Sequence, residues 1–176
     1  MCLRISKNFI KDPLPEETTP EPFIYEQDFV VYKTVKKEYV GEEILYWSPV
    51  QDTPIRFKDG MCEMSTDFFG IRWYPSFDDG SEYIFCINEG IHAHTNKLLN
   101  EHTEPPGLWR VFTSIHYAVI PAGTEFYWGD SSDIVAKRMI VFETEEDFEK
   151  YRETHNVAAT TQAWTHSREE MKKLQK

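Results

Sequence analysis

Two histidines one residue apart, His92 and His94, are the residues whose spacing points most directly to chemistry in this sequence. They lie in the stretch GIHAHTNK, and on a β-strand side chains two positions apart point to the same face. Two imidazoles on one face suit zinc, iron or copper, because neutral ring nitrogens bind these ions at about 2 Å. The candidates for further ligands are His102 with Glu101 or Glu104, and His116.

An ordinary structural role explains the same pair. His92 and His94 also suit the polar face of a strand that precedes a short helix, which we expect from Asn96 to about His102. The sequence does not identify an assured third metal ligand for this pair. We therefore expect the purified protein to hold no metal ion; if it does hold one, the expected ligands are His92, His94 and His116.

The order of these residues resembles the cupin family in part. The first cupin motif runs from a glycine through H-x-H to Glu and Gly, and the second has P-x-G followed by a metal-binding His. The matching residues are Gly90, His92, His94, Glu101 and Gly107, then Pro121 and Gly123. Glu101 is further from His94 than in the family, Gly90 is closer to His92, and Phe126 replaces the second-motif histidine. The resemblance implies a metal-dependent β-barrel enzyme.

A second group of residues has the types that often line ligand clefts, in the stretches VYKTV and LYWSPV. With His92 it forms the candidate ligand-binding set: Tyr32, Lys33, Tyr46, Trp47, Ser48 and His92. The layout is similar in part to ADP-ribosyltransferase folds, in which a His or Arg, a Tyr or Ser and a late Glu form the nicotinamide pocket. Here Lys33 takes the early position, and Glu125 or Glu143 takes the late one. The resemblance implies NAD as cofactor, whereas cross-strand packing also explains the aromatic residues.

Other kinds of chemistry find little support. The sequence has no GxSxG elbow and no glycine-rich phosphate loop. The cysteines are Cys2, Cys62 and Cys86, whose spacing predicts neither a disulfide framework nor a zinc knuckle. Cys86 lies in an apolar strand and suits a small buried side chain. No signal peptide or membrane span is expected, so we predict a cytoplasmic protein.

Composition predicts one aromatic-rich domain. The chain has 176 residues, 40% apolar and 15% aromatic, which is enough to bury a core. The 19 basic residues against 30 acidic ones give a formal charge of −11, which repels phosphate backbones. We therefore expect no nucleic-acid partner, and a protein or small-molecule ligand instead.

Hydrophobic patterns predict an α+β fold, mainly an antiparallel β-sheet or a partly open barrel with two or three peripheral helices. Strands are expected at residues 28–35, 42–50, 70–75, 82–88, 108–120 and 133–143, with a hairpin turn at Asp59-Gly60 between residues 55 and 64. In the strand 108–120 the odd positions are expected to be buried, which places His116 on the outward face.

The expected domain layout has three parts. Residues 1–28 form an N-terminal segment with an acidic, proline-rich connector at 11–22, expected to be extended. Residues 28–157 form one β-rich domain, and 158–176 a C-terminal helical tail. Two capping boxes are expected, at Thr144 with Asp147 and at Ser167 with Glu170.

Several short motifs in order, "MCL", "VVYKTV", "YWSPV", "GIHAH" and "IPAGTEFYWG", resemble a family of uncharacterised proteins of bacteriophages, prophages and gut Bacteroides-type bacteria. The resemblance covers most of residues 1–143 and implies no particular activity. It implies that His92 belongs to the common frame of the fold, whereas His94 stands where such sequences usually carry an aromatic residue.

These observations favour a binding or accessory domain of phage or mobile-element origin over an enzyme. Its contact surface is expected on the aromatic strands 42–50 and 70–75. An NAD-using enzyme with an ADP-ribosyltransferase-like fold is the second hypothesis, and a cupin-like metal enzyme is the third.

Overall fold

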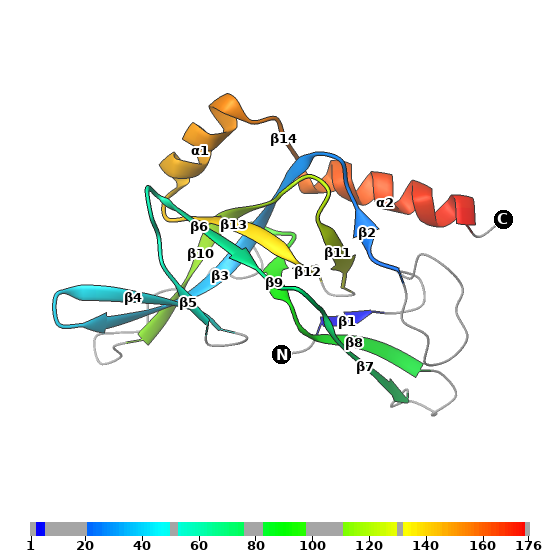
Figure 1. The fold of residues 1–176 in the computed structure, drawn as a ribbon, viewed down its shortest axis with the longest axis horizontal. Helices are drawn as coiled ribbons and strands as arrows, with labels where there is room; N and C mark the ends of the chain where they lie inside the picture. The colour runs from blue at the N-terminus through cyan, green and yellow to red at the C-terminus, as the bar shows by residue number, and fades with distance from the viewer. Residues whose placement is uncertain are drawn as a thin grey trace.

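The structure, a computed structural model, describes residues 3–5, 21–49, 53–75, 83–97, 111–129 and 132–174. The protein has an α+β fold in which one large, open, antiparallel sheet carries two helices (Figure 1). This is the fold class that the sequence predicted. In spatial order the main sheet contains β2 (Phe23–Ile24), β11 (Glu125–Trp128), β12 (Asp133–Ala136), β9 (Ile91–His94), β3 (Asp28–Val40), β10 (Val111–Ile120), β13 (Arg138–Phe142) and β6 (Met61–Ser65).

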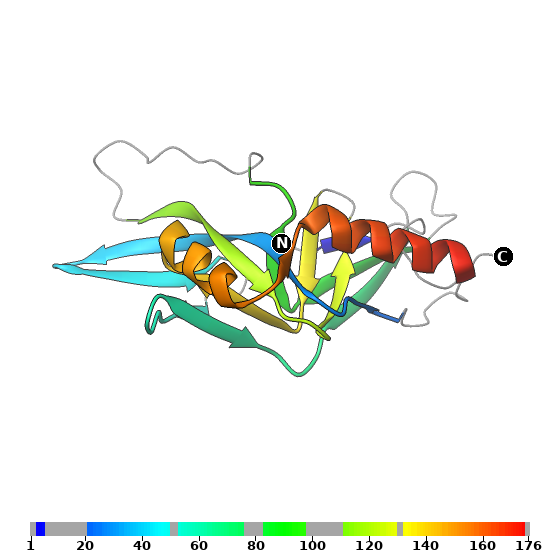
Figure 2. The same ribbon diagram turned by 90° about the horizontal axis from the view of Figure 1, so that it is seen from above.

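The remaining elements attach to this sheet or lie beside it. Strand β4 (Glu43–Ser48) pairs with the far half of β3 and with β5 (Thr53–Ile55), and β14 (Val157–Ala158) pairs with β3 in parallel. A small separate sheet has the order β1 (Leu3–Ile5), β8 (Tyr83–Glu89), β7 (Gly70–Pro75). The β3–β4 hairpin and helix α2 (Thr160–Leu174) lie at opposite ends of the long axis (Figures 1 and 2), so their surfaces are separate.

Strand β3 organises the core because its side chains alternate strictly. Phe29, Val31, Lys33 and Val35 are buried, whereas the residues between them are half-buried. The buried side joins the main hydrophobic core with residues of β9, β11, β12 and β13 and with Ala163 and Met171 of α2. The other side faces a second cluster around Val119 and Phe142, on which Phe148 of α1 (Glu145–Thr154) packs. Both faces of the sheet are therefore covered along part of β3 and β10.

Because both faces of the sheet are covered along β10, one expectation about this strand is wrong. His116 was expected on the outward face of its strand, but only 6% of the residue is exposed. Its ring stacks against Phe57 with 5.7 Å between the centroids, and the Tyr46 ring lies nearly perpendicular to it with 6.3 Å between the centroids. Ile115 and Tyr117, expected to be buried, are half-buried. The alternation of β10 identified two faces but not the segment that would cover the second one.

The segment 133–143 was expected to be one strand, and the structure divides it at Lys137. The first part, β12, pairs with β9 and β11, and the second, β13, pairs with β10 and β6. The chain thus crosses between two halves of the sheet. The predicted turn at Asp59-Gly60 is present, with positive φ at both residues, and it is closed by a bridge between Lys58 and Met61. Its flanking strands β5 and β6, however, pair with other strands.

The two helices differ in how well their starts were predicted. Helix α1 begins with the expected capping box, in which the Thr144 side chain accepts from the Asp147 backbone and Asp147 accepts in return. Helix α2 begins at Thr160, so the capping box expected at Ser167 is wrong. Ser167 is buried within the helix, and its hydroxyl donates to the Ala163 carbonyl at 2.9 Å. Serine within a helix often bonds in this way to the carbonyl four residues earlier.

The segments expected to flank the domain contribute to its sheets and core. Phe23 of β2 is buried, β1 pairs with β8, and α2 packs onto β3. Three expectations fall wholly or partly outside the described residues: residues 11–20 of the connector expected at 11–22, residues 98–102 of the helix expected from Asn96 to about His102, and the candidate ligands at 101, 102 and 104. Of the described helices, none has the length and apolar character needed to span a membrane.

Candidate functional site

The predicted ligand-binding residues separate onto two faces of the sheet. Tyr32 and Lys33 are neighbours on β3, so their side chains point in opposite directions. Lys33 faces the interior with Ser48, whereas Tyr32 faces the side on which its register partner His94 lies. The sheet therefore does not bring Tyr32, Lys33, Ser48 and His92 together in one pocket. The ADP-ribosyltransferase-like hypothesis requires such a pocket.

Lys33 is an unusual interior residue. Only 1% of it is exposed, and its Nζ donates to Ser48 Oγ at 3.0 Å, a hydroxyl that is itself buried. Burial lowers the pKa of the Lys33 ammonium group from 10.5 to about 8, because the charged form loses its water. Among the described residues no ion pair with a carboxylate compensates this charge, so the amine is close to its neutral form at mildly alkaline pH.

A cleft of about 400 Å³ opens beside the β4–β5 hairpin; we call it the hairpin cleft. Its lining is mostly apolar and aromatic: Ile44, Leu45, Tyr46, Trp47, Pro54, Ile55, Arg56, Phe57 and Glu143. It therefore contains two of the predicted ligand residues, Tyr46 and Trp47, and one of the two predicted late acids. Burial, and then the negative charge of Glu143, raises the pKa of the Tyr46 hydroxyl.

His116 lies behind the wall of this cleft, against Tyr46 and Phe57. Its Nδ1 is 2.8 Å from the carbonyl oxygen of Phe142, and its Nε2 is 2.8 Å from Ser114 Oγ. Across the strand pair its register partner is Lys33. Sequence reasoning considered His116 as a metal ligand and did not single out Ser114 or Phe57, although the S-x-H spacing on one strand face was visible.

The other predicted histidines lie on the opposite face. His92 and His94 are both half-buried on β9, where they pair with Val135 and with Asp133 and Tyr32. Asp133 Oδ1 lies 3.9 Å from His94 Nδ1. Burial, with a contribution from the charge of Lys33, lowers the pKa of His92 to about 4. Its Nε2 is buried and has no hydrogen-bond partner within the described part of the chain.

The three histidines do not converge on a metal site. His94 is paired with Tyr32 and His116 with Lys33, so the two imidazoles project from opposite faces of the same sheet. Among the described residues no group of three His, Cys, Asp or Glu side chains is placed to hold a metal ion. Glu125 forms an ion pair with Lys137, and Cys86 is buried.

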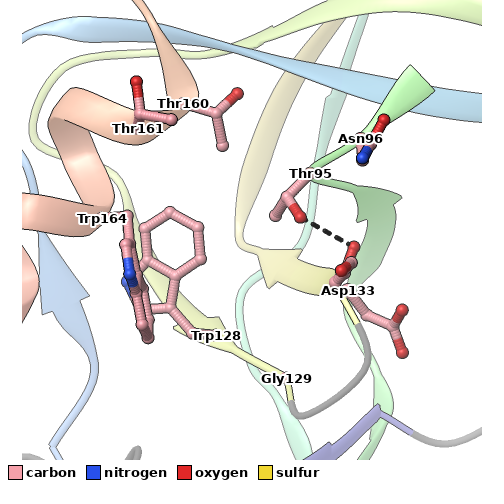
Figure 3. Close-up of a pocket in the computed structure, with 9 residues that line it drawn as sticks. Thr95, Asn96, Trp128, Gly129, Asp133, Thr160, Thr161 and Trp164 are labelled. Carbon is pink, nitrogen blue, oxygen red and sulfur yellow. Dashed lines mark hydrogen bonds between the residues drawn. The ribbon is translucent and has the colours of Figure 1, made fainter. Parts of the chain in front are cut away.

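Sequence reasoning missed a second pocket of about 330 Å³ at the start of α2 (Figure 3), which we call the tryptophan pocket. Segments from β9, β11, β12 and α2 form its wall, with lining residues Thr95, Asn96, Trp128, Gly129, Ser132, Asp133, Thr160, Thr161 and Trp164. Only the tertiary structure brings them together.

The aromatic side of the tryptophan pocket is an edge-to-face pair of indoles. Trp128 is buried in the core, and the half-buried Trp164 contacts it edge-to-face with 5.1 Å between the ring centroids. Thr95, Asn96 and Asp133 lie across the pocket from the two indoles (Figure 3). This polar wall is held in place because Thr95 donates from both its backbone and its hydroxyl to the Ser132 carbonyl, at 2.8 and 3.0 Å.

The expected contact surface is exposed in part. The tip of the β3–β4 hairpin carries four large apolar side chains that are 38–51% exposed: Tyr39, Val40, Ile44 and Leu45. Two of them belong to the predicted surface at 42–50. The side chains of residues 71–75, the other predicted contact strand, lie outside those described.

No protein-family model, no curated protein and no solved structure shows significant similarity to this chain.

Proposed function

We propose that the protein is a small-molecule binding domain, and that its ligand is a neutral ring compound rich in hydroxyl groups, such as a monosaccharide, bound in the tryptophan pocket. The observation that carries this proposal is that the half-buried Trp164 lies opposite a polar wall on the far side of the pocket. A pocket of about 330 Å³ is within the usual range for small ligands.

The two sides of the pocket suit the two surfaces of such a ring. A flat apolar ring face packs well against an indole, and Trp128 keeps the Trp164 indole in a fixed orientation. The amide of Asn96, the carboxylate of Asp133 and the hydroxyl of Thr161 supply donors and acceptors for hydroxyl groups at the ring edge.

Charge favours a neutral ligand over an anionic one. Asp133 is the one charged side chain among the described residues that line the pocket, and the chain as a whole carries a formal charge of −11. A phosphorylated ligand would therefore be repelled both locally and at long range. The charge of Asp133 and the net charge of the chain thus both disfavour nucleotides, NAD included, as occupants of the pocket.

Titration with a panel of hexoses and pentoses, followed by tryptophan fluorescence and by calorimetry, tests the proposal. We expect saturable binding of at least one sugar, with loss of binding in Trp164→Ala and weaker binding in Asp133→Asn. Trp47→Ala is the matched control, because it removes a half-buried indole from the hairpin cleft instead, and it should leave binding unchanged. Absence of saturable binding across the panel, or binding that survives Trp164→Ala, contradicts the proposal.

A further inference from the structure

We propose that the hairpin cleft binds a small zwitterion of the betaine type, in which a short apolar chain joins a trimethylammonium group to a carboxylate. The site is independent of the tryptophan pocket, because the β4–β5 hairpin and the start of α2 lie toward opposite ends of the molecule (Figure 1). It gives the protein a second ligand, distinct from the neutral ring compound of the tryptophan pocket.

Three aromatic side chains line the hairpin cleft, and two of them form a corner. The rings of Tyr46 and Phe57 are nearly perpendicular, with an interplanar angle of 82° and 5.0 Å between their centroids. Trp47 lines the cleft from the next position on β4. All three residues are half-buried, so the cleft gives access to part of each. The faces of aromatic rings carry negative potential, and a group of them therefore attracts an organic cation.

The attraction of this corner for a cation is visible within the protein itself. Lys37 is the register partner of Tyr46, and its Nζ lies 5.6 Å from the centroid of the Tyr46 ring. This distance is within the range of a cation–π interaction. Lys37 is not among the residues that line the cleft. The cleft side of the corner can therefore take a second cation, provided that a negative charge lies nearby.

Two exposed side chains of opposite charge complete the lining, Arg56 and Glu143. Within the described part of the chain neither takes part in an ion pair, so both charges are available to a ligand. Burial, and then the charge of Glu143, raises the pKa of the Tyr46 hydroxyl, which places Glu143 beside the aromatic corner. A zwitterion uses both charges, with its cation between the rings and Glu143 and its carboxylate paired with Arg56.

The lining favours a trimethylated ammonium group over a primary one. A primary ammonium has three N–H donors, and each needs an acceptor when the group leaves water. The side chains of the cleft offer only the Glu143 carboxylate and the Tyr46 hydroxyl as acceptors, and most of the others are apolar. A trimethylammonium group has no donor to satisfy, and its methyl groups pack against the rings and the aliphatic side chains.

Calorimetric titration of the full chain with glycine betaine and its longer-chain homologues tests the proposal. We expect saturable binding of at least one homologue. Its carbon isostere, in which tert-butyl replaces trimethylammonium, has the same shape without the positive charge and should bind at least about 10-fold more weakly. The primary-amine analogue should lose affinity to a similar extent. These comparisons use the unchanged chain, so they do not depend on whether a variant folds.

Three variants separate the contributions of the lining residues. Phe57→Leu keeps an apolar side chain but removes the ring, and it should weaken betaine binding by about 5-fold or more. Arg56→Gln should weaken binding of the betaine but strengthen binding of choline, which has the trimethylammonium group without the carboxylate. Glu143→Gln should weaken binding of both compounds.

Trp164→Ala is the matched control, because it removes a half-buried indole from the tryptophan pocket instead, and it should leave betaine binding unchanged. Loss of betaine binding in this variant would place the ligand in the other pocket and overturn the proposal. Absence of saturable binding across the homologues, equal affinity for the carbon isostere, or binding that is unchanged in both Phe57→Leu and Arg56→Gln would overturn it as well.

Discussion

Lys33 and His116 lie directly opposite each other on the paired strands β3 and β10, and both side chains are buried on the interior face. Burial penalises the charged form of each group, because that form loses its water. The pKa of both groups is lowered mainly by this burial. A polar centre that prefers to be uncharged thus stands in an otherwise apolar core.

Folding stability should rise with pH because of Lys33. The pKa of the amine is about 8 in the folded state against 10.5 when unfolded, so the unfolded chain binds more protons between these values. The penalty of the buried charge is fully present below pH 8 and disappears by about pH 10.5, a gain of about 3 kcal/mol in the free energy of unfolding. Urea denaturation across this range should show the gain relative to Lys33→Met. The exposed Lys172→Met is the control and should keep the slope of the unchanged protein.

Acid should destabilise the fold through His92. Its pKa is lowered from 6.5 to about 4, so the unfolded chain binds the extra proton first as the pH falls through this window. The free energy of unfolding should fall by at most about 3 kcal/mol between pH 6.5 and pH 4 on this account. His92→Leu should flatten the acid side of the stability curve, whereas His155→Leu, at an exposed position after α1, should not. Equal slopes in the two variants would rule His92 out as the cause.

Gly60 should tolerate alanine far less well than Gly41, although both have positive φ values, of 79° and 64°. A Cβ at Gly41 meets no atom within 4 Å, so Gly41→Ala should cost about 1–2 kcal/mol for backbone strain alone. A Cβ at Gly60 would lie 2.2 Å from Asp147 Oδ1 and displace the carboxylate that caps α1. Loss of that cap adds about 1 kcal/mol or more. Thermal unfolding of both variants measures the difference. In an Asp147→Ala background the extra cost at Gly60 should vanish.

Asp28 should couple α1 to the sheet. One carboxylate oxygen accepts from the Tyr151 hydroxyl and the other from the Ala122 backbone N–H, both at 2.8 Å. Tyr151→Phe removes one hydrogen bond to a charged group and should lower the free energy of unfolding by about 1–2 kcal/mol. In the presence of Asp28→Ala the same change should have almost no effect. A double-mutant cycle in urea gives this coupling directly, and independent, additive costs would show that the bond contributes nothing.

What the sequence determined by itself was local. Alternation along residues 28–35, the Asp59-Gly60 turn and the Thr144 capping box depend on side-chain period, backbone freedom and hydrogen bonds within a few residues, and each is present in the structure. The sequence also placed His92 and His94 on one strand face, because the two-residue period of a strand requires it. The α+β class followed from the same patterns.

Only the tertiary structure decided which other segments each candidate residue contacts. Whether His116 faced solvent depended on Phe57, a residue 59 positions earlier in the chain, which covers it. The break at Lys137 arose because the two halves of that segment pair with different strands, and Ser167 joined a helix that begins seven residues earlier. The tryptophan pocket needs Thr95, Trp128, Asp133 and Trp164 side by side. Such contacts depend on the packing of segments distant in sequence, which no local pattern records.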